Sequence, residues 1–159
     1  MNIELLCIGK DNADAFEEAI NQYVKKIKLY NNFDIVVIPY LKNTKSMSFE
    51  EQKRKEGELL LKKITPSDSV VLLDERGKEM TSVEFSGFLQ QKMNSGVKKL
   101  VFVIGGAYGF SEAVYQRQNA KISLSKLTFP HLMTRLILPN SYIGLSLFCT
   151  TSPIIMIKR

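Results

Sequence analysis

The chain has 159 residues, a length that suits one domain with a core of its own. Hydrophobic residues make up 45% and charged residues 24%, which is the balance of an ordinary globular protein and not of a disordered or fibrous chain. No apolar stretch approaches the ~20 uninterrupted residues of a membrane span, and no secretory signal pattern opens the chain. We therefore expect a cytoplasmic protein with no membrane segment. The net charge of +6 favours polyanions as partners.

The first half of the sequence alternates β-branched runs with helical periodicity. The predicted elements are a strand at Ile3–Ile8, a helix at Ala13–Leu29, a strand at Phe33–Ile38, a polar loop at Tyr40–Met47 and a helix from Ser48 to about Ile64. Ser48 is the expected N-cap of that last helix, because Glu51 follows at the spacing of a capping box.

The second half continues the alternation. The predicted elements are a strand at Val70–Leu73, a charged loop at Asp74–Met80, a helix from Thr81 or Ser82 to about Asn94, a strand at Lys99–Ile104, a short helix from Ser111 to about Asn119, a strand at Ile122–Leu124 and a helix from Pro130 through Leu138. Strands that alternate with helices across short loops indicate a single α/β domain with a mainly parallel sheet.

Two segments are candidates for ligand binding. Gly105, Gly106 and Gly109 follow the most apolar strand, where they leave backbone amides free to meet a ligand or simply make a tight turn. They match neither the dinucleotide fingerprint nor a phosphate-binding loop. The second segment, Leu124–His131, offers small hydroxyl and apolar residues that suit an adenine, or a loop that closes the sheet.

The other chemistry-bearing residues give weaker signals. His131 is the only histidine, and a lone histidine at a helix start is more often a packing or capping residue than a catalyst. Cys7 and Cys149 form no metal or disulfide pattern, and Cys7 reads as a small buried residue. No metal site is predicted. Asp74 and Glu75 end a strand, where adjacent acids either contact a ligand or are solvated.

Taken together, these segments resemble the RlmH family. The resemblance rests on an ordered set of motifs. The two main ones are Phe102-Val103-Ile104-Gly105-Gly106 with Gly109, and Leu124-Ser125-Lys126-Leu127-Thr128-Phe129-Pro130-His131 followed by Met133, Arg135 and Leu136. Two shorter matches precede them in the chain: Glu56-Gly57, and Leu73 before Gly77-Lys78. It covers about Met1–Leu138. The whole ordered set is far more specific than any one of its motifs.

The resemblance implies an enzyme of the SPOUT class that transfers a methyl group from S-adenosylmethionine. The substrate atom would be N3 of a pseudouridine in large-subunit (23S) ribosomal RNA, within the assembled ribosome. It also implies a homodimer, no metal, and a parallel sheet whose C-terminal part forms a trefoil knot, an exception to unknotted chains. The implied donor-binding residues are Leu73, Gly105, Leu124, Ser125, Lys126, Leu127, Thr128 and Phe129. Arg135 would face the active site or the dimer partner as the candidate catalytic residue.

The tail, residues 139–159, departs from the family. Its members continue with E-Q-x-Y-R-A and end in P-Y-H-H, whereas this chain has Pro139–Leu145 and ends in Pro153–Arg159. One nucleotide inserted after the Pro139 codon allows the next codons to read Glu-Gln-Leu-Tyr-Arg-Ala, and the same frame allows P-Y-H-H. We hypothesise a one-nucleotide deletion, the alternative being ordinary divergence. The family segment carries residues close to the donor, so its loss predicts weaker donor binding and reduced methylation.

Two other functions fit the same sequence. A non-catalytic RNA- or ribosome-binding module would keep the fold and the basic surface without the reaction. A SPOUT methyltransferase that acts on transfer RNA is less compatible, because this chain has no room for an added RNA-binding extension. Binding of S-adenosylmethionine separates the enzyme from a module with a dead pocket.

Overall fold

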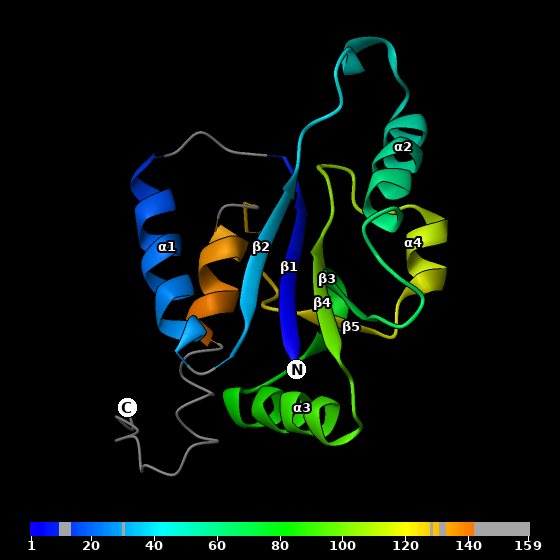
Figure 1. Ribbon diagram of the computed structural model, residues 1–159. Helices are drawn as coiled ribbons and strands as arrows, with labels where there is room; N and C mark the ends of the chain where they lie inside the picture. The colour runs from blue at the N-terminus through cyan, green and yellow to red at the C-terminus, as the bar shows by residue number, and fades with distance from the viewer. Residues whose placement is uncertain (10–13, 30, 128, 131–132, 142–159) are drawn as a thin grey trace.

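The computed structural model describes residues 1–9, 14–29, 31–127, 129–130 and 133–141. Its centre is a five-stranded sheet of order β2-β1-β4-β3-β5, in which every neighbouring pair is parallel (Figure 1). The strands are β1 (Asn2–Ile8), β2 (Phe33–Ile38), β3 (Ser69–Glu79), β4 (Lys99–Ile104) and β5 (Ala120–Ser123). The predicted α/β fold with a parallel sheet is confirmed.

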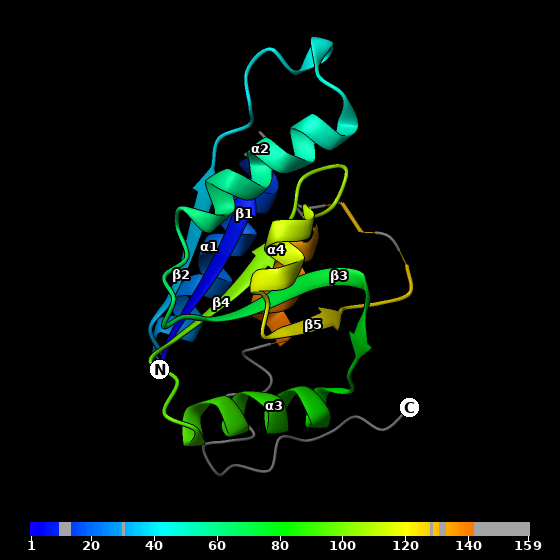
Figure 2. The ribbon, with the colours of Figure 1, turned by 90° about the vertical axis from the view of Figure 1, so that its right-hand side faces the viewer.

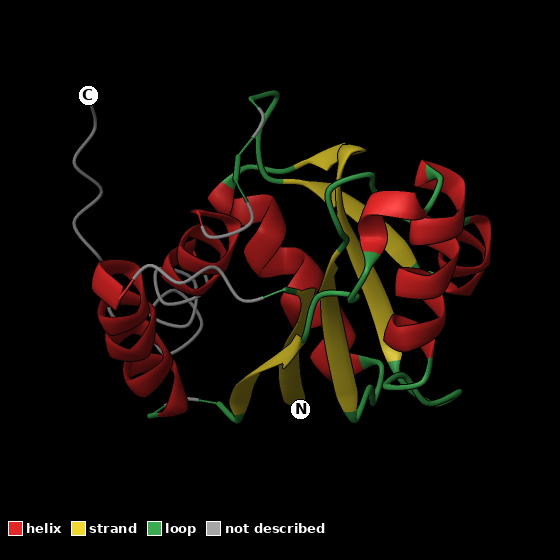
Figure 3. Ribbon diagram, turned by 90° about the horizontal axis from the view of Figure 1, so that it is seen from above, coloured by secondary structure: helices red, strands yellow, loops and turns green. Residues whose placement is uncertain are grey.

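Helices cover both faces of this sheet, as the view from above shows (Figure 3). They are α1 (Asp14–Lys28), α2 (Phe49–Leu61), α3 (Ser82–Asn94), α4 (Glu112–Arg117) and a helix over residues 133–141, with a short 3-10 helix η1 (Thr44–Ser46) before α2. Among the described residues no helix is long and apolar enough to cross a membrane.

The strands are apolar on both sides because both faces are buried, as in other all-parallel sheets. In β1, Leu5 and Cys7 belong to one core cluster, whereas Leu6 and Ile8 belong to the other. The first cluster takes in residues of α1, α3 and the helix at 133–141, and the second takes in residues of α2 and α4. Cys7 is fully buried, as its apolar surroundings in the sequence predict.

The strand β3 is longer than the sequence predicts. The charged stretch expected as a loop continues as strand to Glu79, after an irregularity in the pairing with β5 between Leu73 and Lys78. Beyond it, Lys78 pairs with Ile122 and Glu79 with Ser123. Pairing with β5 therefore overrides the low strand propensity of these charged residues.

Of the predicted N-capping residues, Ser48 and Thr81 make side-chain capping bonds and Ser111 does not. The Ser48 hydroxyl accepts from the Glu51 amide at 3.1 Å, and Thr81 makes a full capping box with Glu84. Ser111 precedes α4 but makes no side-chain capping bond. The last helix extends to residue 141 rather than ending at Leu138.

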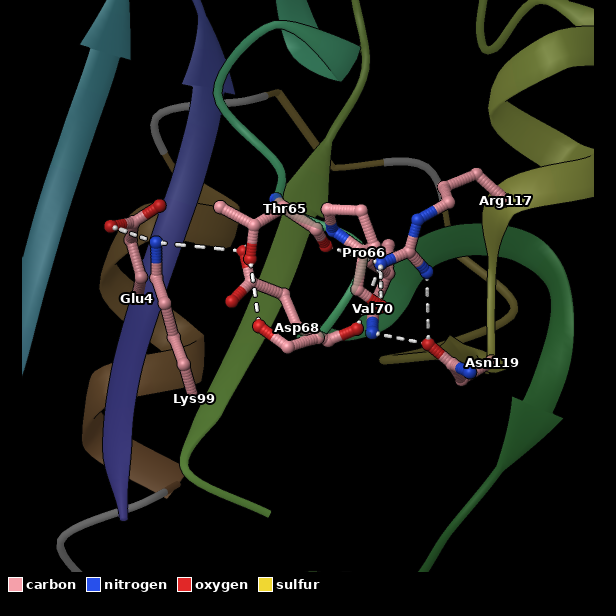
Figure 4. Close-up of polar contacts among 9 residues, drawn as sticks. Glu4, Thr65, Pro66, Asp68, Val70, Lys99, Arg117 and Asn119 are labelled. Atoms are coloured by element: carbon pink, nitrogen blue, oxygen red, sulfur yellow. Dashed lines mark hydrogen bonds and ion pairs between the residues drawn. The ribbon is translucent and has the colours of Figure 1, made fainter.

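At the amino ends of the strands, a polar network ties the turn before β3 to the segment before β5 (Figure 4). Arg117 donates to the carbonyls of Thr65 at 2.7 Å and Asp68 at 2.9 Å. The Asn119 side-chain oxygen accepts from the Val70 amide at 2.8 Å. These bonds fix where β3 and β5 begin, and so they set the position of the two carboxyl ends at which the cavity lies.

Candidate functional site

The cavity lies at the carboxyl ends of three neighbouring strands, β4, β3 and β5, with a volume of about 470 Å³. Ligands of open parallel sheets bind at this edge, and the volume is in the range of small-molecule sites. Its walls come from the end of β3, the glycine loop at residues 105–109, Tyr115 of α4 and the loop that follows β5. Figure 2 shows the loop after β4 and the loop after β5 on the same side of the molecule.

The glycine loop, residues 105–109, is shaped by the side chains that pack against it. Gly109 has a φ of +82°, a conformation that glycine adopts without strain, and its amide donates to the Gly106 carbonyl at 3.1 Å. A Cβ on Gly105 would lie 3.1 Å from the Phe110 ring. A Cβ on Gly106 would overlap the carboxylate of Glu56. Glycine suits position 106 because Glu56 of α2 lies directly against the loop, and it suits position 105 because the Phe110 ring does.

Glu56 is the side chain that α2 places behind this loop. It is only 2% exposed. Its Oε1 accepts from the Gln52 side chain at 2.9 Å, whereas its Oε2 has no hydrogen-bond partner among the described residues. Glu56 thus occupies the space that a side chain at position 106 would need, a constraint that the sequence pattern alone does not show.

The loop after β5 is held by its own serines. The Ser123 hydroxyl donates to the Ser125 carbonyl at 2.8 Å, and the Ser125 hydroxyl accepts from the Leu127 amide at 3.0 Å. Short serine bonds of this kind stabilise turns in place of regular structure.

Of the predicted donor-binding residues, six line the cavity: Leu73, Gly105, Leu124, Ser125, Leu127 and Phe129. Lys126 does not; it is exposed, and its ammonium lies 4.0 Å from the Glu79 carboxylate. Thr128 and His131 lie outside the described residues, and so do Cys149 and most of the atypical tail.

A second polar feature of the cavity comes from Asp74 and Tyr115. The Tyr115 hydroxyl donates to Asp74 Oδ2 at 2.5 Å, although the two residues are 41 positions apart. Burial raises the pKa of Tyr115 to about 12, and the hydrogen bond and negative charge of Asp74 add to this effect. Tyr115 is therefore a neutral donor at ordinary pH, and Asp74 belongs to the cavity rather than to bulk solvent.

The candidate catalytic residue Arg135 is not among the residues that line the cavity. It is 4% exposed, and its guanidinium donates to the Gly9 carbonyl and, at 3.4 Å, to that of Ile8. It ties the last helix to the end of β1. Its neighbour Thr134 lines the cavity instead, and the catalytic role of Arg135 stays a prediction.

The cavity is built for binding and orientation. Its surface combines backbone amides and carbonyls, apolar side chains and a few fixed charges, as in sites for a heterocyclic ligand with polar substituents. Across the part of the chain that the structure describes, no group of histidine, cysteine or acidic residues is arranged to hold a metal ion. The sequence does not single out Tyr115 or decide the role of Asp74, because the two residues come together only through tertiary packing.

Comparison with known proteins decides the family. The family model described as "Predicted SPOUT methyltransferase" matches residues 1–141. The chain belongs to the SPOUT methyltransferase family. It is 56% identical over 137 residues to a protein of Bacteroides thetaiotaomicron named "Ribosomal RNA large subunit methyltransferase H", with 86% of this chain and 87% of that one covered.

Two further relatives carry the same name. The protein of Parabacteroides distasonis is 56% identical over 137 residues, and that of Flavobacterium johnsoniae is 52% identical over 136 residues. Each alignment covers 86% of this chain and 87% of the relative. The resemblance to the RlmH family is confirmed. The trefoil knot stays a prediction.

Proposed function

We propose that this SPOUT methyltransferase transfers the methyl group of S-adenosylmethionine to N3 of a pseudouridine in large-subunit ribosomal RNA. One observation carries the proposal: segments far apart in the sequence, predicted to bind the donor, meet at one cavity at the carboxyl edge of the sheet. The names of the relatives support ribosomal RNA as the substrate. A ribosomal substrate also implies a cytoplasmic protein.

The residues present fit the methyl donor. Leu73, Leu124 and Phe129 offer an apolar surface for a purine, while the glycine loop leaves its backbone open for close approach. Asp74 provides a fixed carboxylate near this surface, with its orientation set by the bond from Tyr115. A carboxylate complements a ligand that carries hydroxyl groups and positive charge.

When bound, the donor supplies an electrophilic methyl group on a sulfonium, so the reaction needs no metal. The protein must align that group with N3 of the base, and alignment alone can supply a large part of the rate. The backbone at 105–109 and at 123–127 is held by packing and by serine hydrogen bonds, which suits this role. Removal of the N3 proton needs a base. Tyr115 is held neutral and is a donor, so we do not assign that role to it.

Arg135 remains the candidate for contact with the substrate or with a second copy of the chain. We propose a homodimer, because the family resemblance implies one. The C-terminal trefoil knot belongs to the same proposal. In this arrangement the donor cavity and the region around the last helix would contribute to one active site.

The proposal is tested by methyl transfer from labelled S-adenosylmethionine to assembled ribosomes, with separated subunits and bare ribosomal RNA as parallel substrates. We expect label in the large-subunit RNA of assembled ribosomes, recovered as N3-methylpseudouridine after digestion. Calorimetry with the donor is the companion measurement. Donor binding together with label on a different nucleoside or RNA would overturn the assignment. No donor binding and no transfer, by a chain that still binds ribosomes, would favour the non-catalytic module.

A further inference from the structure

Two exposed aromatic rings lie together at the mouth of the cavity. Phe49 is 63% exposed and Tyr108 43%, and their ring centroids are 4.3 Å apart with an interplanar angle of 28°. Neither residue belongs to the two core clusters, which lie on either face of the sheet. Tyr108 lines the cavity, and Phe49 is the first residue of α2. The pair is thus a flat apolar surface open to solvent beside the site.

Basic residues lie close to Phe49 along the chain. Residues 39–48, the arm between β2 and α2, project beyond the carboxyl edge of the sheet in both side views (Figures 1 and 2). Lys42 and Lys45 on the arm are exposed and form no ion pair within the part of the chain that the structure describes. Lys53 follows Phe49 by four residues, lines the cavity and forms an ion pair with Glu50 at 2.6 Å.

The charge of this region favours a polyanion over another copy of the protein. Residues 39–55 carry five basic side chains and two acidic ones. In a symmetric contact between two copies the same patch meets itself, so the excess positive charge would be brought together and would oppose association. RNA brings phosphates for the lysines and, where it is unpaired, bases with flat faces for the aromatic pair.

We propose that the arm and the Phe49–Tyr108 pair form a binding surface for single-stranded RNA, in which an unpaired base stacks on the pair and neighbouring phosphates contact Lys42 and Lys45. This rests on the proposed function and adds the part of the protein that receives the RNA. It places the RNA contact immediately beside the cavity mouth, where a base directed toward the cavity would have to pass.

The test measures RNA affinity as a function of salt for the full chain, with assembled ribosomes, with a labelled RNA hairpin that has an unpaired loop, and with a fully paired RNA of the same nucleotide count. Phe49→Ala should weaken hairpin binding by about 5- to 150-fold, the range for one stacked base, with little change for the paired RNA. Phe49→Tyr should retain the affinity. The slope of log affinity against log salt should stay the same for both.

The double variant K42A/K45A should lower the salt slope, which Phe49→Ala leaves unchanged. Loss of two contacts to single-stranded phosphates lowers the salt slope by about 1.4. The matched control is K62A/K63A, which removes the same charge from exposed lysines at the far end of α2 and should leave the slope nearly unchanged. The Kd for S-adenosylmethionine should be unaffected by Phe49→Ala, because Phe49 does not line the cavity.

Several results would overturn the inference. Unchanged hairpin affinity in Phe49→Ala, or an equal fall in slope for K62A/K63A, would show that this surface is not the RNA contact. So would a shift from dimer to monomer in Phe49→Ala, measured by light scattering, which would make the pair an interface between copies. If the unsubstituted chain and Phe49→Ala methylate ribosomes equally well, the RNA-binding surface is refuted while the proposed function stands. If the unsubstituted chain binds no RNA at all, the proposed substrate fails with it.

Discussion

Gly77 is the residue at which a single added methyl group should disturb both the sheet and the cavity. It lies in the irregular part of β3, opposite the end of β5. A Cβ at this position would lie 2.6 Å from the backbone nitrogens of Ile122 and of Ser123. Ordinary contact needs about 3.4 Å or more, so β3 and β5 would have to move apart by about 0.8 Å or more. Backbone atoms cannot relieve this by changing rotamer.

We expect Gly77→Ala to lower the free energy of unfolding by about 1–3 kcal/mol, the usual effect of overpacking, less ~0.4–1 kcal/mol from the smaller backbone entropy of the unfolded chain. For a chain of this length that corresponds to a Tm lower by roughly 2–8 °C. The displaced end of β5 leads directly into the loop at 124–127, so the Kd for the methyl donor should rise as well.

Gly87→Ala is the matched control for this prediction. Gly87 lies within α3, with nothing within 4 Å of an added Cβ. Alanine there should stabilise the helix by about 0.5–1 kcal/mol and leave donor binding unchanged. Thermal unfolding followed by circular dichroism and donor titration by calorimetry measure both effects. A Tm for Gly77→Ala equal to or above that of the unsubstituted chain would refute the reasoning.

Three further predictions concern the site. Tyr115→Phe removes the hydroxyl group whose pKa is raised to about 12 by burial and by the bond to Asp74; the stability linked to this shift is fully present below pH 10 and is lost as the pH rises to about 12. The free energy of unfolding of the variant, measured over this pH range, should lack that step. Glu56→Ala opens a space behind the glycine loop and should weaken donor binding by about tenfold, whereas Glu56→Gln should retain most of it in calorimetry. Replacing residues 139–159 by the family-like reading should raise methylation of ribosomes, and equal activity of the two chains would count against the prediction that the atypical tail impairs the reaction.

The order of the sheet elements could be predicted because the local pattern is strong. The strands at Phe33–Ile38 and Lys99–Ile104 have the predicted bounds, since each is a short apolar run between clear turn residues. The end of β3 could not be predicted in the same way. Five of the six residues 74–79 are charged, and the strand continues to Glu79 because Lys78 and Glu79 pair with β5 beyond the irregularity.

The cavity divides into a part that local sequence reveals and a part that it does not. The glycine and serine segments were visible because each contains the residues that its own turn requires. The place of Arg135 in the site rests on the family resemblance, and only the structure shows that its guanidinium donates to backbone carbonyls at the end of β1. A sequence motif places a residue near a site but does not tell which way the side chain points.

The contacts that fix the shape of the cavity join residues that lie far apart in the chain. Asp74 meets Tyr115 across 41 positions, and Glu56 of α2 meets the loop at Gly106. Both contacts connect a cavity wall to the outer helices α2 and α4, which also pack on each other. Because interiors are close-packed, a shift of either helix would be transmitted to the wall it supports. The same helix α2 begins at Phe49, so one helix carries both the exposed aromatic residue and the Glu56 side chain behind Gly106.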